Sequence, residues 1–130
     1  MSVIVTDRGF GPDDWTDGFE GAEALDLASD ADLDAPEVAD RLGSVRMVRV
    51  AFPSFSDGRG FTLARLLRLR GYRGRLRAQG HVIADQYAMA RRAGFDEVEI
   101  ADDLAERQPE DQWMARADWR AHDYQARIRG

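Results

Sequence analysis

The residues with the clearest chemical potential form the segment D-G-R-G, which is Asp57, Gly58, Arg59 and Gly60, directly before a leucine-rich run with helical spacing. Backbone N–H groups at a helix start and the guanidinium of Arg59 would together attract an anion. The dinucleotide fingerprint G-x-G-x-x-G is incomplete, because Leu63 stands at its third glycine position. The alternative is structural: the glycines serve a turn, and Asp57 and Arg59 pair with each other or with neighbouring backbone.

A second junction, Q-G-H, separates the next strand-like run from a helix-like run and places His81 four residues before Asp85. This spacing puts both side chains on one face of the first helical turn, with Gln86 beside them. A histidine oriented by a carboxylate is a minimal general acid/base, so His81 and Asp85 are the catalytic candidates. The alternative is that the pair caps the helix. The nearby hydroxyls that would supply a nucleophile are Ser54, Ser56 and Thr62.

Arg77 lies in the middle of a short strand-like run, with Leu76 and Ala78 pointing to the opposite face. A buried guanidinium needs a carboxylate or a bound anion. The candidate residues for binding an anion or a partner are therefore Asp57, Gly58, Arg59, Gly60, Arg77 and Gln86. The two histidines, His81 and His122, lie in different segments, and we expect neither a metal site nor a cofactor.

These residues need elements that bring them together, and the hydrophobic pattern predicts a parallel βαβαβ unit over residues 45–100. Because parallel crossovers are right-handed, both helices should cover one face of the strands, and loops at the carboxyl ends should meet at one edge. The predicted elements are strands at Val45–Phe52, Arg75–Gln79 and Glu97–Ile100, a helix that Thr62 caps and Gly71 ends, and a helix at Val82–Ala93.

An acidic leader, residues 1–44, should carry smaller elements. We expect a hairpin beginning at Val3–Val5, which Trp15 and Phe19 pack on the core, and a weak strand around Leu25. A short helix should follow over the segment P-E-V-A-D-R-L before Gly43, because proline favours the first helical turn and glycine ends it.

The last segment, residues 101–130, predicts a C-terminal helix opening at Pro109 and a tail. Its large aromatic side chains should dock on the domain, on a partner or on a second copy of the chain; they are Trp113, Trp119 and Tyr124. The chain is thus predicted to be a single α/β domain of 130 residues. It should have a small, mostly parallel sheet with three to four parallel strands, a short N-terminal hairpin and a C-terminal helix.

Charge is unevenly distributed along the chain. Residues 1–45 hold 12 acidic groups against two arginines, a balance of −10, whereas residues 46–100 hold 11 arginines against five acidic groups, a balance of +6. The remainder contributes −2 to the total of −6. An acidic leader folded beside a basic core would satisfy much of this charge internally.

Composition excludes several classes of chemistry and partner. There is no cysteine and no lysine, which removes disulfides, thiolate nucleophiles and Schiff bases. A pI near 4.9 argues against nucleic acid as a partner. No apolar run approaches the roughly 20 residues that cross a bilayer, and the start of the chain lacks signal-peptide features, so we expect no membrane contact and a cytoplasmic location.

Three stretches carry a resemblance to a known family. They read F-P-S-F-S-D-G-R-G-F-T-L-A-R-L-L-R, G-Y-R-G-R-L-R-A-Q-G-H-V-I-A-D-Q and R-A-G-F-D-E-V-E. The chain resembles the bacterial domain-of-unknown-function family 934, whose members carry the description of an oxidoreductase of sulfite reduction. The resemblance is strongest from Val45 to Ile100. In many members a cysteine precedes the Gly-Phe-Asp motif, where this chain has Ala93, and this departure argues against a thiol mechanism here.

The resemblance implies a role in sulfur assimilation, because genes of the family lie beside those of sulfite reductase and adenylylsulfate-type reductases. We therefore expect an accessory protein that binds a small anion or one of those enzymes at the C-terminal edge of its strands. The alternative is a small enzyme acting on a sulfonated or phosphorylated metabolite, with Arg59 and Arg77 as anion clamp and His81 as acid/base. An oxidoreductase activity rests on the family description alone, since no redox-active side chain or cofactor motif stands in the sequence.

Overall fold

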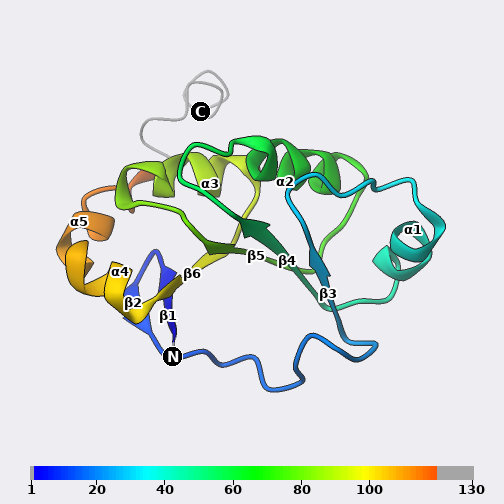
Figure 1. The fold of residues 1–130 in the computed structure, drawn as a ribbon, viewed down its shortest axis with the longest axis horizontal. Coiled ribbons are helices and arrows are strands. Elements are labelled where there is room, and N and C mark those ends of the chain that lie inside the picture. The colour runs from blue at the N-terminus through cyan, green and yellow to red at the C-terminus, as the bar shows by residue number, and fades with distance from the viewer. Residues whose placement is uncertain (1, 120–130) are drawn as a thin grey trace.

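The computed structural model describes residues 2–119, and these form one six-stranded mixed sheet with helices over one face and at both ends (Figure 1). The strand order is β2-β1-β6-β5-β4-β3. In chain order the elements are β1 (Ser2–Thr6), β2 (Gly9–Gly11), β3 (Ala24–Leu27), α1 (Pro36–Leu42), β4 (Met47–Phe52), α2 (Arg59–Leu69), β5 (Arg75–Gly80), a 3₁₀ turn (Ala84–Gln86), α3 (Tyr87–Ala93), β6 (Glu97–Ala101), α4 (Asp102–Arg107) and α5 (Glu110–Met114).

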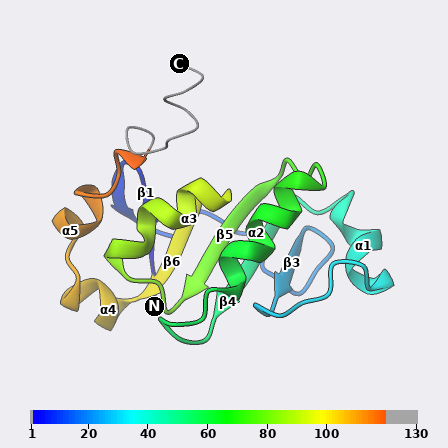
Figure 2. The same cartoon turned by 90° about the horizontal axis from the view of Figure 1, so that it is seen from above.

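The predicted parallel unit is confirmed. Strands β3, β4, β5 and β6 run parallel, and their registers place Val50 beside Ala78 and Ala78 beside Val98. The weak strand expected around Leu25 is β3, the fourth parallel strand. Helices α2 and α3 lie side by side over the same face of the sheet, as the handedness of parallel crossovers requires (Figure 2).

The N-terminal hairpin is also present, but it is part of the sheet. β1 pairs antiparallel with β2 on one side and antiparallel with β6 on the other, where Val5 lies beside Val98. Without β1, β6 would be an unprotected sheet edge with unpaired backbone groups. The hairpin therefore completes the sheet that the central unit begins.

The face beneath α2 and α3 holds the apolar core. Alternate strand residues point toward the helices and are buried, including Val48, Val50, Phe52, Leu76, Ala78, Val98 and Ile100. The helices meet them with Leu63, Ala64, Leu67, Tyr87, Ala90 and Ala93. These buried residues recur at the helical and strand periods of the sequence. This periodicity is why the sequence predicts the two helices and three strands that the structure contains.

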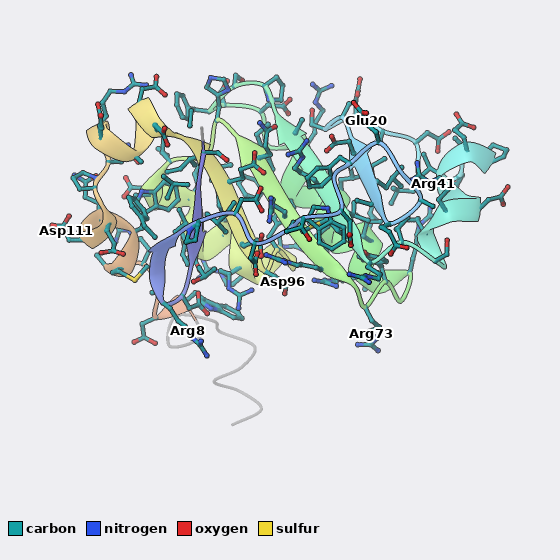
Figure 3. All side chains as sticks on the ribbon, turned by 90° about the horizontal axis from the view of Figure 1, so that it is seen from below. Arg8, Glu20, Arg41, Arg73, Asp96 and Asp111 are labelled. Carbon is teal, nitrogen blue, oxygen red and sulfur yellow. The ribbon has the colours of Figure 1, made fainter. Side chains whose placement is uncertain are left out.

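The opposite face of the same strands is charged. We call the following residues the ionic layer: Asp26, Arg49, Arg75, Arg77, Glu97 and Glu99. Residues 12–23, which we call the strap, link β2 to β3 and pass across this layer, as the view from below shows (Figure 3). A sheet face that is covered in this way is ordinarily apolar. Because burying charge without a partner is costly, the charged side chains of the strap and of the ionic layer must pair with each other.

Arg77 is the centre of the ionic layer and is fully buried. Its guanidinium donates to Glu97 Oε2 at 2.6 Å and to Glu99 Oε1 at 2.9 Å from the neighbouring strand. It also donates to both oxygens of Asp13 in the strap, at 3.1 and 3.0 Å. Of the two possibilities for a buried arginine in this strand, a carboxylate or a bound anion, the fold supplies carboxylates.

Further contacts along the strap repeat this pairing. Arg75 binds Glu97 and the strap residue Asp14, and Arg49 binds Asp26 at 2.7 Å. Phe19 lies under the Arg49 guanidinium, 3.6 Å from ring centroid to the central carbon. The expected internal balance between acidic leader and basic core is confirmed.

The same contacts correct the role expected of two aromatic residues. Trp15 and Phe19 were expected to pack the hairpin on the apolar core. They lie instead against arginines, Trp15 near Arg46 and Phe19 over Arg49, because the strap crosses the charged face.

Two helix starts differ from the predictions. α2 begins at Arg59 with Gly58 as its N-cap, so Thr62 lies inside the helix and does not cap it. The helix predicted from Val82 begins with a 3₁₀ turn, and α3 proper starts at Tyr87.

α4, which follows β6 without a loop, was not predicted. Within residues 2–119 no helix is both long and apolar enough to cross a membrane.

The aromatic residues of the last segment have different positions. Trp113 is fully buried, meets Tyr87 edge-on at 6.1 Å and donates its indole N–H to the Gln108 carbonyl, so the folded chain leaves it no surface for a second copy. Trp119 donates to Asp7 and lies near Arg91, which docks it on the domain. Tyr124 lies outside the described residues.

Replacing Arg77 with methionine should destabilise the fold strongly. The change removes the cation that three carboxylates share and leaves charge buried without its partner, which costs about 3 kcal/mol or more. Urea unfolding followed by far-UV circular dichroism measures the loss. Arg73→Met, at an exposed position without a side-chain partner in the described residues, is the matched control and should change stability by less than about 0.5 kcal/mol. Equal effects of the two substitutions would contradict a structural role for the ionic layer.

The strap contact should also make stability depend on pH. Burial by itself raises the pKa of Asp13, but hydrogen bonds from Arg77 outweigh it and hold that pKa below its usual value of 3.8. A lowered folded pKa stabilises the native state above the unfolded pKa, and this stabilisation is lost as pH falls through the folded pKa.

Asp13→Asn removes that titration. The difference in unfolding free energy between wild type and Asp13→Asn should therefore be largest above about pH 5 and should shrink toward about pH 2. Urea midpoints across that range test this. A difference that stays constant with pH would mean that the Asp13 carboxylate is not the titrating group.

Candidate functional site

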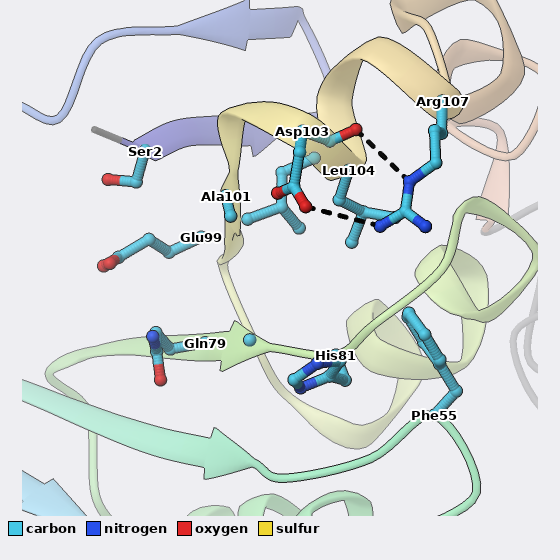
Figure 4. A pocket seen from close by; sticks show the side chains of 11 residues that line it. Ser2, Phe55, Gln79, His81, Glu99, Ala101, Asp103, Leu104 and Arg107 are labelled. Carbon is cyan, nitrogen blue, oxygen red and sulfur yellow. Dashed lines mark hydrogen bonds and ion pairs between the residues drawn. The ribbon is translucent and has the colours of Figure 1, made fainter.

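The carboxyl ends of β5 and β6 and the start of α4 enclose a pocket of about 320 Å³ (Figure 4), which we call the edge pocket. It lies at the sheet edge where the sequence places ligand chemistry. Its lining residues are Ser2, Phe55, Gln79, Gly80, His81, Glu99, Ile100, Ala101, Asp103, Leu104 and Arg107.

His81 enters the edge pocket because of the residue before it. Gly80 has a φ of 111°, and a Cβ there would lie 2.8 Å from the Phe52 carbonyl oxygen, so glycine is required for the chain to turn at this point. The His81 backbone N–H then donates to the same carbonyl at 3.0 Å.

The His81 ring is held by the carbonyl as well. Nδ1 lies 3.2 Å from the Phe52 oxygen, and because a carbonyl only accepts, Nδ1 carries the proton. The ring meets Phe55 edge-on at 5.1 Å. Within residues 2–119 no hydrogen bond engages Nε2, so its lone pair can take a proton, and the protonated ring can donate to an anion.

The cation of the edge pocket is Arg107, the last residue of α4. Its guanidinium lies 3.5 Å from an Asp103 carboxylate oxygen, and both side chains are mostly exposed, at 69% and 76%. Nε of Arg107 also donates to the Asp103 carbonyl oxygen at 3.4 Å, and because both contacts are long and exposed they are weak, so Arg107 can turn toward a ligand. Sequence analysis missed this residue because α4 was not predicted. The acidic first turn and basic last turn of D-D-L-A-E-R were the available signal.

Glu99 connects the edge pocket to the ionic layer. It lines the pocket, while its carboxylate accepts from Arg77 at 2.9 Å and from Arg49 at 3.1 Å. Its negative charge is therefore balanced from the sheet side. Gln79 lies beside Glu99 in the strand register and makes no side-chain hydrogen bond within residues 2–119.

The structure does not bring Arg59 together with His81 in one pocket. Both oxygens of Asp57 bind the Arg59 guanidinium, at 3.0 and 2.9 Å, and Ser29 donates to Asp57 at 2.8 Å. The hydrogen bonds from Arg59 hold the pKa of Asp57 far below its usual value. Arg59 lines a separate hollow beside Asp30, between α2 and the end of β3. The pairing of Asp57 with Arg59 matches the structural alternative.

Asp85 and Gln86 also have partners other than His81. Asp85 accepts from Arg116 at 2.8 Å, so within the described part of the chain it does not orient the His81 ring. Gln86 accepts from the Ile83 backbone at 3.0 Å and donates to the Phe55 carbonyl at 2.9 Å. Gln86 thus ties the loop after β4 to the turn after β5 and braces the wall of the edge pocket.

Gly58 and Gly60 differ in what surrounds them. Gly58 has an ordinary helical φ of −85°, and a Cβ there would meet nothing within 4 Å. A Cβ on Gly60 would lie 2.4 Å from the Phe52 ring, which is itself packed on Phe61 and Phe95. Gly60 serves close packing of α2 on β4. Residues 2–119 contain no group of three or more His, Asp or Glu side chains placed to hold a metal ion.

Comparison with known proteins gives one match. The model of a family described as "bacterial protein of unknown function (DUF934)" matches residues 24–130. No curated protein and no solved structure matches the chain.

Alanine at Gly58 and alanine at Gly60 should have opposite consequences. Gly60→Ala forces the buried Phe52 ring to shift, an overpacking cost of about 1 to 3 kcal/mol. Gly58→Ala should be neutral or slightly stabilising, because its backbone already suits alanine and the unfolded chain loses freedom. Urea unfolding of both variants measures the contrast. A large loss at Gly58 would indicate that its backbone does more than turn the chain.

Proposed function

The chain belongs to the bacterial family of unknown function DUF934, and from this premise we propose that it is a cytoplasmic accessory protein of assimilatory sulfate and sulfite reduction. In this role it binds a small oxyanion, or a sulfur-assimilation enzyme, at the carboxyl edge of its parallel strands. The sulfur context comes from the family resemblance. The residues that line the edge pocket supply the hydrogen-bond donors for the proposed ligand.

The observation that carries the proposal is the set of hydrogen-bond donors around the edge pocket. Sulfite and sulfate accept hydrogen bonds and carry negative charge, and the pocket offers the guanidinium of Arg107, the amide of Gln79, the hydroxyl of Ser2 and, in its protonated form, Nε2 of His81. The charge of Glu99 is already balanced by Arg77 and Arg49. An incoming anion would replace Asp103 as the partner of Arg107.

The size and the rim of the edge pocket favour the binding of a partner enzyme over the binding of a small anion alone. A volume of about 320 Å³ exceeds what one small oxyanion fills, so an anionic side chain or cofactor group of a partner enzyme also fits. Phe55 is 40% exposed at the rim and offers an apolar contact to such a partner. Sulfite reductase and adenylylsulfate-type reductase are the proposed partners.

The alternative, an enzyme acting on a sulfonated or phosphorylated metabolite, has support from His81. Its Nδ1–H is fixed on a carbonyl, which leaves Nε2 as acid/base. The anion clamp expected from Arg59 and Arg77 has weaker support, because carboxylates occupy both guanidinium groups. In that alternative Arg107 is the clamp.

Thermal unfolding with sulfite, sulfate, phosphate and chloride tests the proposal. A ligand that binds the native state at about 100 times its Kd stabilises it by about 2.7 kcal/mol, which raises Tm by several degrees. We expect such a rise with sulfite or sulfate but not with chloride, and its loss in Arg107→Ala. Arg92→Ala, another exposed arginine, is the control and should retain the rise. Stabilisation that survives Arg107→Ala would overturn the assignment of the pocket.

Growth of a deletion strain tests the proposed role in sulfur assimilation separately from ligand binding at the edge pocket. A deletion strain should grow poorly on sulfate or sulfite as its sulfur source and normally on sulfide or cysteine, and Arg107→Ala should fail to restore it. Normal growth of the deletion strain on every source would contradict the sulfur role.

A further inference from the structure

The polar groups of the edge pocket are not all hydrogen-bond donors. Its side chains include the carboxylates of Glu99 and Asp103 beside the guanidinium of Arg107. Arg77 and Arg49 hold Glu99 from the sheet side. Arg107, by contrast, has only its long contacts to Asp103 within residues 2–119. An anion in this pocket therefore meets one cation that it can bind and two carboxylates that repel it.

His81 adds a further acceptor when its ring is neutral. The carbonyl oxygen of Phe52 lies 3.2 Å from Nδ1 and keeps the proton of the neutral ring on that nitrogen. Nε2 then carries a lone pair, and no hydrogen bond engages it in the described part of the chain. His81 is exposed and lines the edge pocket, so a bound ligand can reach Nε2 (Figure 4).

The charged groups that face His81 come from β6 and α4. They are Glu99, Asp103 and Arg107, which line the same pocket. The end of β4 and the loop after it contribute only a carbonyl oxygen and an aromatic ring. Asp85, in the 3₁₀ turn that follows His81, pairs with an arginine after α5. Among the described residues that line the pocket, Arg107 is thus the only cation as long as the His81 ring is neutral.

We propose that the edge pocket selects oxyanions that keep a proton, such as hydrogensulfite and hydrogenphosphate, over sulfate. The O–H of such an anion donates to Nε2 of neutral His81, while its other oxygens accept from Arg107 and Gln79. Sulfate carries no proton near neutral pH, so one of its oxygens would face the Nε2 lone pair without a hydrogen between them. The inference rests on the proposed function, because it names the class of anion that the same pocket takes.

Protonation of His81 should remove this selection. An imidazole changes its charge between about pH 5 and 8, and the imidazolium donates from Nε2 as well as from Nδ1. Sulfate then meets a donor and an added positive charge in place of a lone pair. We therefore expect phosphate and sulfate to be distinguished at about pH 8 and to bind similarly at about pH 5.5.

Isothermal titration calorimetry of the full-length chain with inorganic phosphate and with sulfate tests this inference. Hydrogenphosphate and sulfate are both tetrahedral dianions, so at about pH 8 they differ in the proton rather than in charge or shape. Wild type should bind phosphate about tenfold or more tightly than sulfate at that pH. Sulfite, kept free of oxygen near neutral pH, should likewise bind more tightly than sulfate.

His81→Gln is the variant that identifies the selecting group. Its side-chain amide can turn to donate at every pH, so at about pH 8 the affinity for sulfate should rise toward the affinity for phosphate. Asp103→Asn removes a carboxylate but leaves the Nε2 lone pair, so it should strengthen the binding of both anions and keep the preference for phosphate. Both positions are exposed, so the fold should persist.

Two further variants tie the measurement to the edge pocket. Arg107→Ala should lose the binding of both anions. Glu106→Gln is the charge control, because Glu106 is an exposed residue of α4 that does not line the pocket, and it should bind both anions as wild type does.

Three results would count against the inference, and they differ in what else they remove. Equal binding of phosphate and sulfate by wild type at about pH 8 would leave an anion site that does not distinguish the proton. Continued rejection of sulfate by His81→Gln would assign the selection to another group. The absence of binding for every oxyanion at both pH values would remove the anion site of the proposed function together with its selectivity.

Discussion

The buried guanidinium of Arg77 is the constraint on which the rest of this fold depends. A charge without solvent contact must be fully paired, and Arg77 is paired by Glu97 and Glu99 from β6 and by Asp13 from the strap. Asp13 can form its ion pair with Arg77 only if the strap crosses the sheet at the level of Arg77. The acidic leader is therefore a structural layer of the domain. Its excess negative charge balances the excess positive charge of the strands.

The edge pocket begins where the ionic layer ends. Gln79 follows Arg77 on the same face of β5, and Glu99, which lies beside Gln79 in register, serves both regions. Two arginines hold the Glu99 carboxylate from the sheet side, so its charge is balanced at that wall of the pocket. Charge available to a ligand then comes from the opposite wall, where Arg107 is only loosely tied to Asp103.

Carboxylates of the leader pair with arginines on both faces of the sheet. Acidic residues of the leader are drawn to Arg46, Arg49, Arg75 and Arg77 across the strap. On the helical side, Asp34 binds Arg70 at 2.8 Å and Asp7 binds Arg91 at 3.2 Å. The leader therefore balances charge on both sides of the buried core, whereas Arg65, Arg73 and Arg92 have no side-chain partner within residues 2–119.

Much of the architecture was predictable because strand and helix periods are local properties. Alternation at Val48, Val50 and Phe52, the leucines of α2 and the glycine that ends α3 are enough to specify a parallel βαβαβ unit, and the charge blocks indicated that leader and core would pair. The insertion of β1 beside β6 was not predictable, and neither was the separation of Arg59 from His81. Asp13 meets Arg77 across 64 residues, and Arg107 joins His81 from a helix that follows a different strand. Contacts between distant segments depend on strand order and chain path, which no local pattern encodes, so tertiary structure decided which charges are buried and which remain available.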